Sequence, residues 1–174
     1  MSPRTIFSPY ARLFDVPGAA SFSFAGWLAR LPMPILGLGA VLLVEGKTGS
    51  YGLAGAVAGT LALVNSLASP QWARAMDRRG QGLILRLAFA GYLVVGVAFV
   101  AAVVLGAPQW SWFVLSGLTG ACGPNVGSVV RARWADALDA ERRQTAFAFE
   151  SVVDEVVFVV GPPLVTLLAT LVNP

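Results

Sequence analysis

The sequence contains no histidine and only one cysteine, Cys122, among its 174 residues. Without histidine, the chain lacks the commonest metal ligand and the side chain that most often relays protons near neutral pH. Any proton chemistry therefore has to use carboxylates. A single cysteine excludes a disulfide framework, and because Cys122 lies in an apolar, glycine-rich run, we expect it to be a small packing residue. We expect no metal and no cofactor.

Charged residues are also scarce. They make up 12% of the chain, against about 25% in an ordinary soluble domain. Hydrophobic residues make up 56%, and the mean hydropathy is +0.72. These charges are too few to give a protein of this length a polar surface. We therefore expect its apolar surface to face lipid. The pI near 9.6 does not indicate nucleic-acid binding, because the basic residues form short clusters between apolar runs, as topology signals do.

Long apolar runs fill most of the sequence. Five segments each supply the roughly 20 mostly apolar residues that a membrane-spanning helix needs. They are residues 18–44, 51–73, 83–106, 110–131 and 144–172. The first is too long for the core of a signal peptide and no convincing cleavage site follows it, so we expect a retained helix. The sequence predicts an all-α membrane protein with about five transmembrane helices.

The basic residues are distributed unevenly between the two ends of these segments. If the five helices alternate in direction, ten arginines lie on one side and only Lys47 on the other. The arginines are Arg4, Arg12, Arg74, Arg78, Arg79, Arg86, Arg131, Arg133, Arg142 and Arg143. The positive-inside rule places this side in the cytoplasm. We therefore predict a multi-pass plasma-membrane protein with a cytoplasmic N-terminus.

The five segments differ in character. Segment 83–106 has no acidic residue and only Arg86 near one end, so we expect it to face lipid. The first, fourth and fifth segments contain prolines and glycines, which break helices or let them approach closely in a protein interior. We expect Asp139 to cap the start of the fifth helix.

Four charged residues lie inside apolar segments and away from the segment ends. Arg30 is about 16 Å along the first helix, near the middle of a core of about 30 Å, and the fifth segment contains Glu150, Asp154 and Glu155. Because an unpaired charge is costly in lipid, we expect Arg30 to lie in the bundle interior and to approach Asp154 or Glu155.

This group of charges permits two interpretations. Intramembrane charges usually mark transport pathways, so the four residues form a candidate site for a polar substrate or a proton. The alternative is a buried ion pair that only holds two helices together. For Arg131 and Arg133, at the end of the fourth segment, the simpler interpretation is that they anchor the helix at the membrane surface.

The polar stretch after the second segment contains Asp77-Arg78-Arg79-Gly80. As a plain cytoplasmic turn it would explain the arginines but not the isolated Asp77. The run resembles the first signature loop of the major facilitator superfamily, Gly-x-Leu-x-Asp-Arg-x-Gly-Arg, at Asp77, Arg78 and Gly80. It departs from that pattern at Ala73, Ala75 and Gln81. The resemblance implies that Asp77, Arg78 and Gly80 belong to a cytoplasmic latch between the two halves of a transporter.

A second, shorter resemblance lies in the fifth segment. Gly161-Pro162 resembles the centre of the signature found there in antiporters of the same superfamily, although Val157 replaces an earlier glycine and the later paired glycines are absent. An ordinary proline kink explains the pair equally well. The resemblance favours export only slightly.

Together these resemblances imply the N-terminal portion of a major facilitator transporter, whose fold has two six-helix halves. Because the sequence provides about five helices, we expect a partial chain that lacks the sixth helix and the C-terminal half. The implied function is secondary active transport of a small solute by alternating access, coupled to protons or to another gradient, with proton-coupled export as one candidate mode. The implied partners are the lipid bilayer, an unknown small-molecule substrate and the missing half, and no nucleic acid.

The rival function is that of a non-transporting membrane bundle or assembly subunit, in which intramembrane ion pairs are purely structural. A membrane enzyme is disfavoured because the sequence shows neither paired metal ligands nor a nucleophile with its base.

Overall fold

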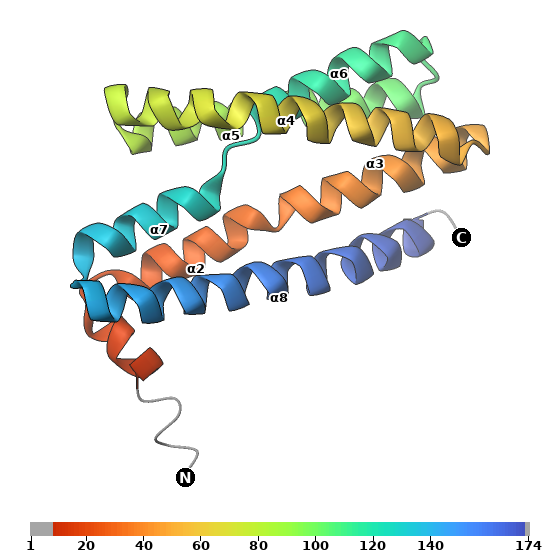
Figure 1. Cartoon of the computed structure of the whole chain (residues 1–174). Coiled ribbons are helices and arrows are strands. Elements are labelled where there is room, and N and C mark those ends of the chain that lie inside the picture. Colours follow the sequence, from red (N-terminus) through yellow and green to blue (C-terminus); the bar gives the residue numbers. More distant parts are fainter. Residues whose placement is uncertain (1–8, 173–174) are drawn as a thin grey trace. The chain divides into compact units, whose positions relative to one another are not determined.

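The computed structural model describes residues 9–172, and in this range the chain forms helices and no strand (Figure 1). The elements are η1 (Arg12–Asp15), α2 (Ala19–Arg30), α3 (Pro32–Thr48), α4 (Tyr51–Arg79), α5 (Gln81–Val104), α6 (Gln109–Cys122), α7 (Val126–Ala137) and α8 (Ala140–Val172). Five helical stretches are long and apolar enough to cross a membrane. They are Ala19–Thr48, Tyr51–Arg79, Gln81–Val104, Gln109–Ala137 and Ala140–Leu171. The predicted all-α membrane fold is confirmed.

Two of these spans are broken, where the sequence suggested single helices. The first span is interrupted at Leu31, between α2 and α3, and the fourth at residues 123–125, between α6 and α7. A proline lies at each break, Pro32 and Pro124, and its missing N–H removes a backbone hydrogen bond. The fifth span differs, because α8 continues through Pro162 and Pro163.

The connection between the second and third spans is shorter than the sequence suggested. The expected polar stretch from Arg74 to Gly82 is helical except for Gly80, so this part of the prediction is wrong. Gly80 has a φ of 86°, which is a backbone conformation that favours glycine. One residue in this conformation is enough to end α4 and start α5.

The chain divides into two compact units. The first comprises residues 1–34 and 126–161, and the second comprises residues 35–125 and 162–174. The first unit therefore contains η1, α2, α7 and most of α8, whereas α4, α5 and α6 belong to the second. Each unit is described separately below.

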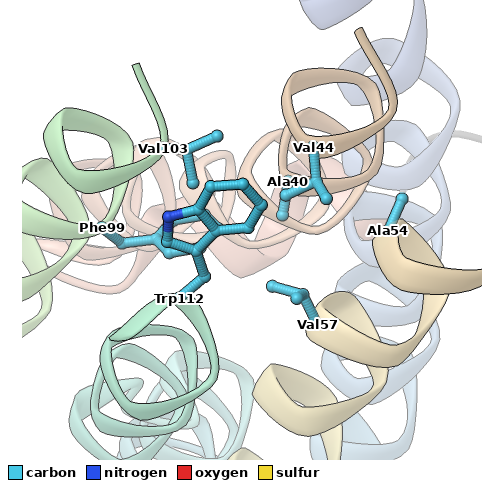
Figure 2. Close-up of a cluster of buried hydrophobic side chains, with 7 residues drawn as sticks. All are labelled: Ala40, Val44, Ala54, Val57, Phe99, Val103 and Trp112. Carbon is cyan, nitrogen blue, oxygen red and sulfur yellow. The ribbon is translucent and has the colours of Figure 1, made fainter. Parts of the chain in front are cut away.

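In the second unit, α4, α5 and α6 pack against one another. Figure 2 shows the indole of Trp112 among small and branched apolar side chains of the core cluster, which comprises Ala40, Val44, Ala54, Val57, Phe99, Val103 and Trp112. The indole Nε1 of Trp112 donates to the carbonyl oxygen of Ala102 at 3.3 Å, so this buried polar atom is satisfied.

Helix α6 approaches α4 very closely. A Cβ atom on Gly120 would collide with the carbonyl group of Leu61. Side chains of α4 also donate to the free carbonyl groups at the end of α6: Asn65 Nδ2 bonds the oxygens of Gly120 and Gly123 at 3.0 and 2.9 Å, and Trp72 Nε1 bonds that of Ala121 at 2.6 Å. These bonds satisfy acceptors that the helix break leaves without intrahelical partners.

Helix α5 has one buried stripe, at Ile84, Ala88, Gly96, Phe99 and Val103. Several of its other large side chains are exposed, among them Leu83, Leu87, Leu93, Val94 and Val97. This pattern is typical of a helix that packs along one stripe, and the expectation that this span faces lipid stays a prediction.

In the first unit, α2 packs against α7. Gly26 allows the close approach, since a Cβ there would lie 2.6 Å from Cγ2 of Val130. Phe22 and Trp134 make an edge-to-face contact with ring centroids 4.7 Å apart. The backbone N–H of Arg142 donates to Asp139 at 2.9 Å, so the predicted cap of the fifth span is present.

Candidate functional site

The buried arginine predicted from the sequence is the last residue of α2. Arg30 is only 7% exposed. It directly precedes the break at Leu31, where Pro32 and Pro34 cannot donate to the last carbonyl groups of α2. A cation at a helix C-terminus is favoured by these partial negative charges. The local sequence therefore explains why the helix ends here and part of why it ends on an arginine.

Glu150 of α8 is the main partner of Arg30. The Nη2 atom of Arg30 donates to Oε2 of Glu150 at 2.6 Å, and the indole Nε1 of Trp134 donates to Oε1 at 2.8 Å. Glu150 is 1% exposed. Both carboxylate oxygens thus have a short bond to a donor on a different helix, and the group is fixed in place.

Asp154, one turn further along α8, is held less tightly and by two arginines. Its Oδ1 lies 3.4 Å from Nη1 of Arg30, and its Oδ2 accepts a bond of 2.7 Å from Nη2 of Arg131. Its side chain is 32% exposed, and that of Arg131 is similar. Asp154 therefore links α2 to α7 and remains the accessible carboxylate of the group.

We refer to Arg30, Arg131, Trp134, Glu150 and Asp154 as the charge cluster. All five belong to the first unit. Spacing along two helices brings them together: Arg131 and Trp134 are three positions apart on α7, and Glu150 and Asp154 are four positions apart on α8, so each pair shares a helix face. Two arginines balance two carboxylates.

Two buried donor atoms of the charge cluster have no acceptor among the described residues. Within the described part of the chain, Nε and Nη1 of Arg30 are buried without a hydrogen bond. The 3.4 Å approach of Nη1 to Asp154 is an ion-pair contact and not a hydrogen bond. A buried guanidinium normally uses its five N–H groups, so this one has capacity for a further acceptor.

The expected pairing of Arg30 is confirmed for Asp154 and wrong for Glu155. Glu155 is exposed and lines an open, apolar hollow on another face of α8, together with Ser151, Val152 and Val156. The 100° rotation between successive helical residues explains the difference. Whether the remaining candidates bind a substrate or a proton stays a prediction.

Sequence reasoning missed two members of the charge cluster. Arg131 was interpreted as a surface anchor, but its guanidinium bonds Asp154. Trp134 was not recognised at all. Their spacing of three positions shows that Arg131 and Trp134 lie on the same face of α7. Only the packing of α2 on α7 shows that this face points inward. Arg133, in contrast, is exposed as an anchor would be.

Across the described residues, no group of three or more histidine, cysteine or acidic side chains is arranged to hold a metal ion.

A family model described as Major Facilitator Superfamily matches residues 16–174. The chain belongs to the Major Facilitator Superfamily. No curated protein and no solved structure matches it in the corresponding comparisons.

The Major Facilitator Superfamily loop resemblance can now be placed on the structure. Asp77 and Arg78 lie in the last turn of α4 and are exposed, and Gly80 is the residue that separates α4 from α5. Neither Asp77 nor Arg78 forms a side-chain hydrogen bond or ion pair with another described residue. Their role as a latch remains a prediction.

The Gly161-Pro162 step of this superfamily member lies inside α8 and does not interrupt it. Pro162 and Pro163 nevertheless lack the N–H groups that would bond the carbonyl groups of Phe158 and Val159. The hydroxyl of Thr166 donates to the carbonyl oxygen of Pro162 at 2.9 Å. The predicted kink at Gly161 and Pro162 therefore corresponds to a local loss of backbone bonds in a continuous helix.

Proposed function

We propose that this chain is part of a secondary active transporter in which Asp154 of the charge cluster exchanges a proton during transport. Membership of the Major Facilitator Superfamily supports solute transport across a membrane, and thereby a transporter in preference to an enzyme. The solute, the proton coupling and the mechanism of alternating access belong to the proposal.

The observation that carries the proposal is the difference between two carboxylates on one helix. Glu150 is fully buried and both its oxygens have short bonds, so it serves as the fixed counter-ion of Arg30. Asp154 is partly exposed and shared between Arg30 and Arg131. A group that must gain and lose a proton in each cycle needs access and alternative partners, and Asp154 has both.

Alternating access would use the contacts of Asp154 directly. When Asp154 is ionised, it holds α2 and α7 together through Arg30 and Arg131. When it is protonated, its attraction to both arginines falls, which favours separation of these helices. A protonation step of this kind shifts a two-state equilibrium by the difference in interaction free energy between the states.

We further propose that a second half of the fold completes the substrate path, that the protein lies in the plasma membrane and that its N-terminus is cytoplasmic. The exposed, unpartnered Asp77 and Arg78 support a contact with that half at the cytoplasmic end of α4. The coding DNA beyond codon 174 tests this: it should encode six or seven further apolar spans. A stop codon there would contradict it.

The direction of transport has support only from the resemblance of Gly161-Pro162 to the antiporter signature, which favours export. Neither residue belongs to the charge cluster, so the proposed proton coupling at Asp154 does not depend on it.

The competing function is that of a bundle whose ion pairs only fix the helices. The double variant Arg131→Gln/Asp154→Asn separates the two, because it removes one charge of each sign and strands neither. The intact gene product should be reconstituted in liposomes that contain a pH-sensitive dye and exposed to gradients of small solutes. The proposal predicts a folded variant without solute-driven proton movement. Proton movement at the wild-type rate would support a purely structural role.

A further inference from the structure

We propose that the charge cluster binds a small carboxylate anion together with a proton, and that the anion takes the place of Asp154 between Arg30 and Arg131. This inference rests on the proposed function and names its substrate class. Two observations support it: Arg30 has buried donors without acceptors, and Asp154 lies 3.4 Å from Arg30 without a hydrogen bond between them.

The first step concerns the guanidinium of Arg30. It is 7% exposed, and one of its nitrogens, Nη2, is committed to Glu150 at 2.6 Å. Its other two nitrogens, Nε and Nη1, have no acceptor among the described residues. Leaving buried donors of a charged group unbonded is unfavourable. A ligand with carboxylate oxygens supplies the missing acceptors, and a guanidinium is geometrically matched to a carboxylate.

The second step concerns the group that now occupies this place. Asp154 makes one good bond, to Arg131 at 2.7 Å, while its other oxygen stays 3.4 Å from Nη1 of Arg30. A ligand carboxylate is not tied to the backbone of α8, so it is free to bond both arginines at short distance. Asp154 and Arg131 are also the partly exposed members of the charge cluster, so exchange of partners takes place on its accessible side.

The third step is a count of charge. The two arginines are balanced by Glu150 and Asp154, so a bound anion alone would leave one negative charge in excess. A proton taken up by a carboxylate oxygen of Asp154 restores the balance. Glu150 keeps its bonds to Arg30 and Trp134 throughout. A cationic solute would instead bring a third positive charge beside two arginines, which a low-dielectric site disfavours.

No other titratable group among the described residues contacts Asp154. Its charged neighbours are Arg30 on α2 and Arg131 on α7, with Glu150 one turn away on α8. Glu155 follows it directly in sequence but is exposed, with no ion pair to another described residue. The proton that accompanies the anion is therefore assigned to Asp154. Because anion and proton bind to the same state, the coupling is symport, in contrast to the antiport suggested by the resemblance of Gly161-Pro162.

The test measures ligand binding to the full chain in lipid nanodiscs, with the shift of the thermal unfolding temperature as the readout. The probes are acetate, its neutral isostere acetamide, and ethylammonium, with ionic strength held constant by sodium chloride. Acetate should raise Tm in a saturable way, and the other two should not. With rising pH its affinity should fall with a limiting slope of about tenfold per pH unit, which is the slope that uptake of one proton per bound anion requires.

Variants of the two exchangeable residues sharpen the test. Asp154→Asn imitates the protonated acid, so it should bind acetate with an affinity that no longer depends on pH. Arg131→Gln should bind acetate about tenfold more weakly or worse, because one of two charge-assisted bonds is lost. Arg131 is chosen because Arg30→Gln strands the buried Glu150 and is at risk of not folding. Glu141→Gln, on an exposed turn of α8, should behave as the wild type.

Each remaining result has a defined meaning. Stabilisation by ethylammonium that disappears in Asp154→Asn overturns the anionic substrate but leaves Asp154 as the exchangeable acid of the proposed function. Acetate binding without a pH slope overturns the coupled proton. The ligand site is overturned if acetate binds Arg131→Gln as strongly as the wild type, or if no probe stabilises the chain. The proposed function fails separately, if proton movement in liposomes does not depend on Asp154.

Discussion

Arg30 shows how a single buried charge is tolerated in an apolar chain. Moving an arginine from water into the low-dielectric interior costs several kcal/mol, and three features of this residue offset that cost. Its main partner, Glu150, bonds it at 2.6 Å, Asp154 lies within ion-pair distance, and Arg30 is the last residue of α2, where the helix dipole favours a cation. The indole N–H of Trp134 donates to the second oxygen of Glu150, so both oxygens of this carboxylate are bonded.

The Arg30–Glu150 pair makes a prediction about stability. Arg30→Gln alone or Glu150→Gln alone should lower the free energy of unfolding by about 3–5 kcal/mol, since each strands a buried charge. The double variant should be less destabilised than either single variant. Thermal unfolding of the purified chain in detergent measures this. Additive losses in the double variant would show that the two charges do not interact.

The sequence predicted which acidic helix Arg30 contacts, because opposite charges at equal depth in two apolar segments are costly in lipid unless they pair. It did not predict that Glu150 would be the closer partner, because depth counting carries an error of about one helical turn, which is 5.4 Å. It also missed Arg131, since an arginine near the end of a span satisfies its charge equally well at the membrane surface.

At the scale of helices, backbone groups decide the structure as much as side chains do. The break in the fourth span exposes carbonyl groups of α6 that lipid does not satisfy. Asn65 and Trp72 of α4 donate to three of them. That arrangement requires α4 and α6 to lie almost backbone to backbone, which is why Gly120 has no room for a side chain.

Substitution of two glycines tests this contact. Gly120→Ala should destabilise the chain by about 1–3 kcal/mol, because the new methyl group displaces the Leu61 carbonyl and weakens the bonds of Asn65. Gly55→Ala is the matched control: it lies on α4 with open space around it, so it should be neutral or stabilise by about 0.5–1 kcal/mol. Chemical unfolding of both variants gives the comparison. Equal effects at the two sites would mean that the close approach is absent.

The hydropathy pattern predicted the existence of five spans because each must supply about 20 apolar residues. It did not predict the breaks at Leu31 and residues 123–125. A proline within an apolar run kinks, breaks or is absorbed by a helix depending on which neighbouring donors and acceptors are available. Pro32 and Pro124 lie at breaks, whereas α8 absorbs Pro162 and Pro163.

At the scale of the whole molecule, the ten-to-one distribution of basic residues makes a prediction about topology. In a Cys122→Ala background, a cysteine at Gln81 should react with a membrane-impermeant thiol reagent only after the cells are opened. A cysteine at Gln109, just beyond the other end of the third span, should react in intact cells. The reverse labelling pattern would require an inverted orientation.

The latch is also a property of the assembled transporter. Asp77→Asn in the intact gene product should reduce transport while expression stays close to normal. An exposed carboxylate contributes little to folding, so the protein should still be made. A contact of Asp77 with arginines or helix ends would stabilise one transport conformer by roughly 1–3 kcal/mol, and the variant loses that stabilisation. Uptake or efflux assays with expression measured in parallel decide this. Normal transport in Asp77→Asn would remove the residue from the gating mechanism.

The central claim is that Asp154 is the carboxylate that exchanges its proton during transport. The most direct measurement is solute-driven proton movement in dye-loaded liposomes that contain the intact transporter, compared between Asp154→Asn and Glu155→Gln. These substitutions neutralise adjacent acids on one helix, of which only Asp154 contacts the arginines. We predict that proton movement is lost in Asp154→Asn and retained in Glu155→Gln. Retained proton movement in Asp154→Asn would contradict the claim.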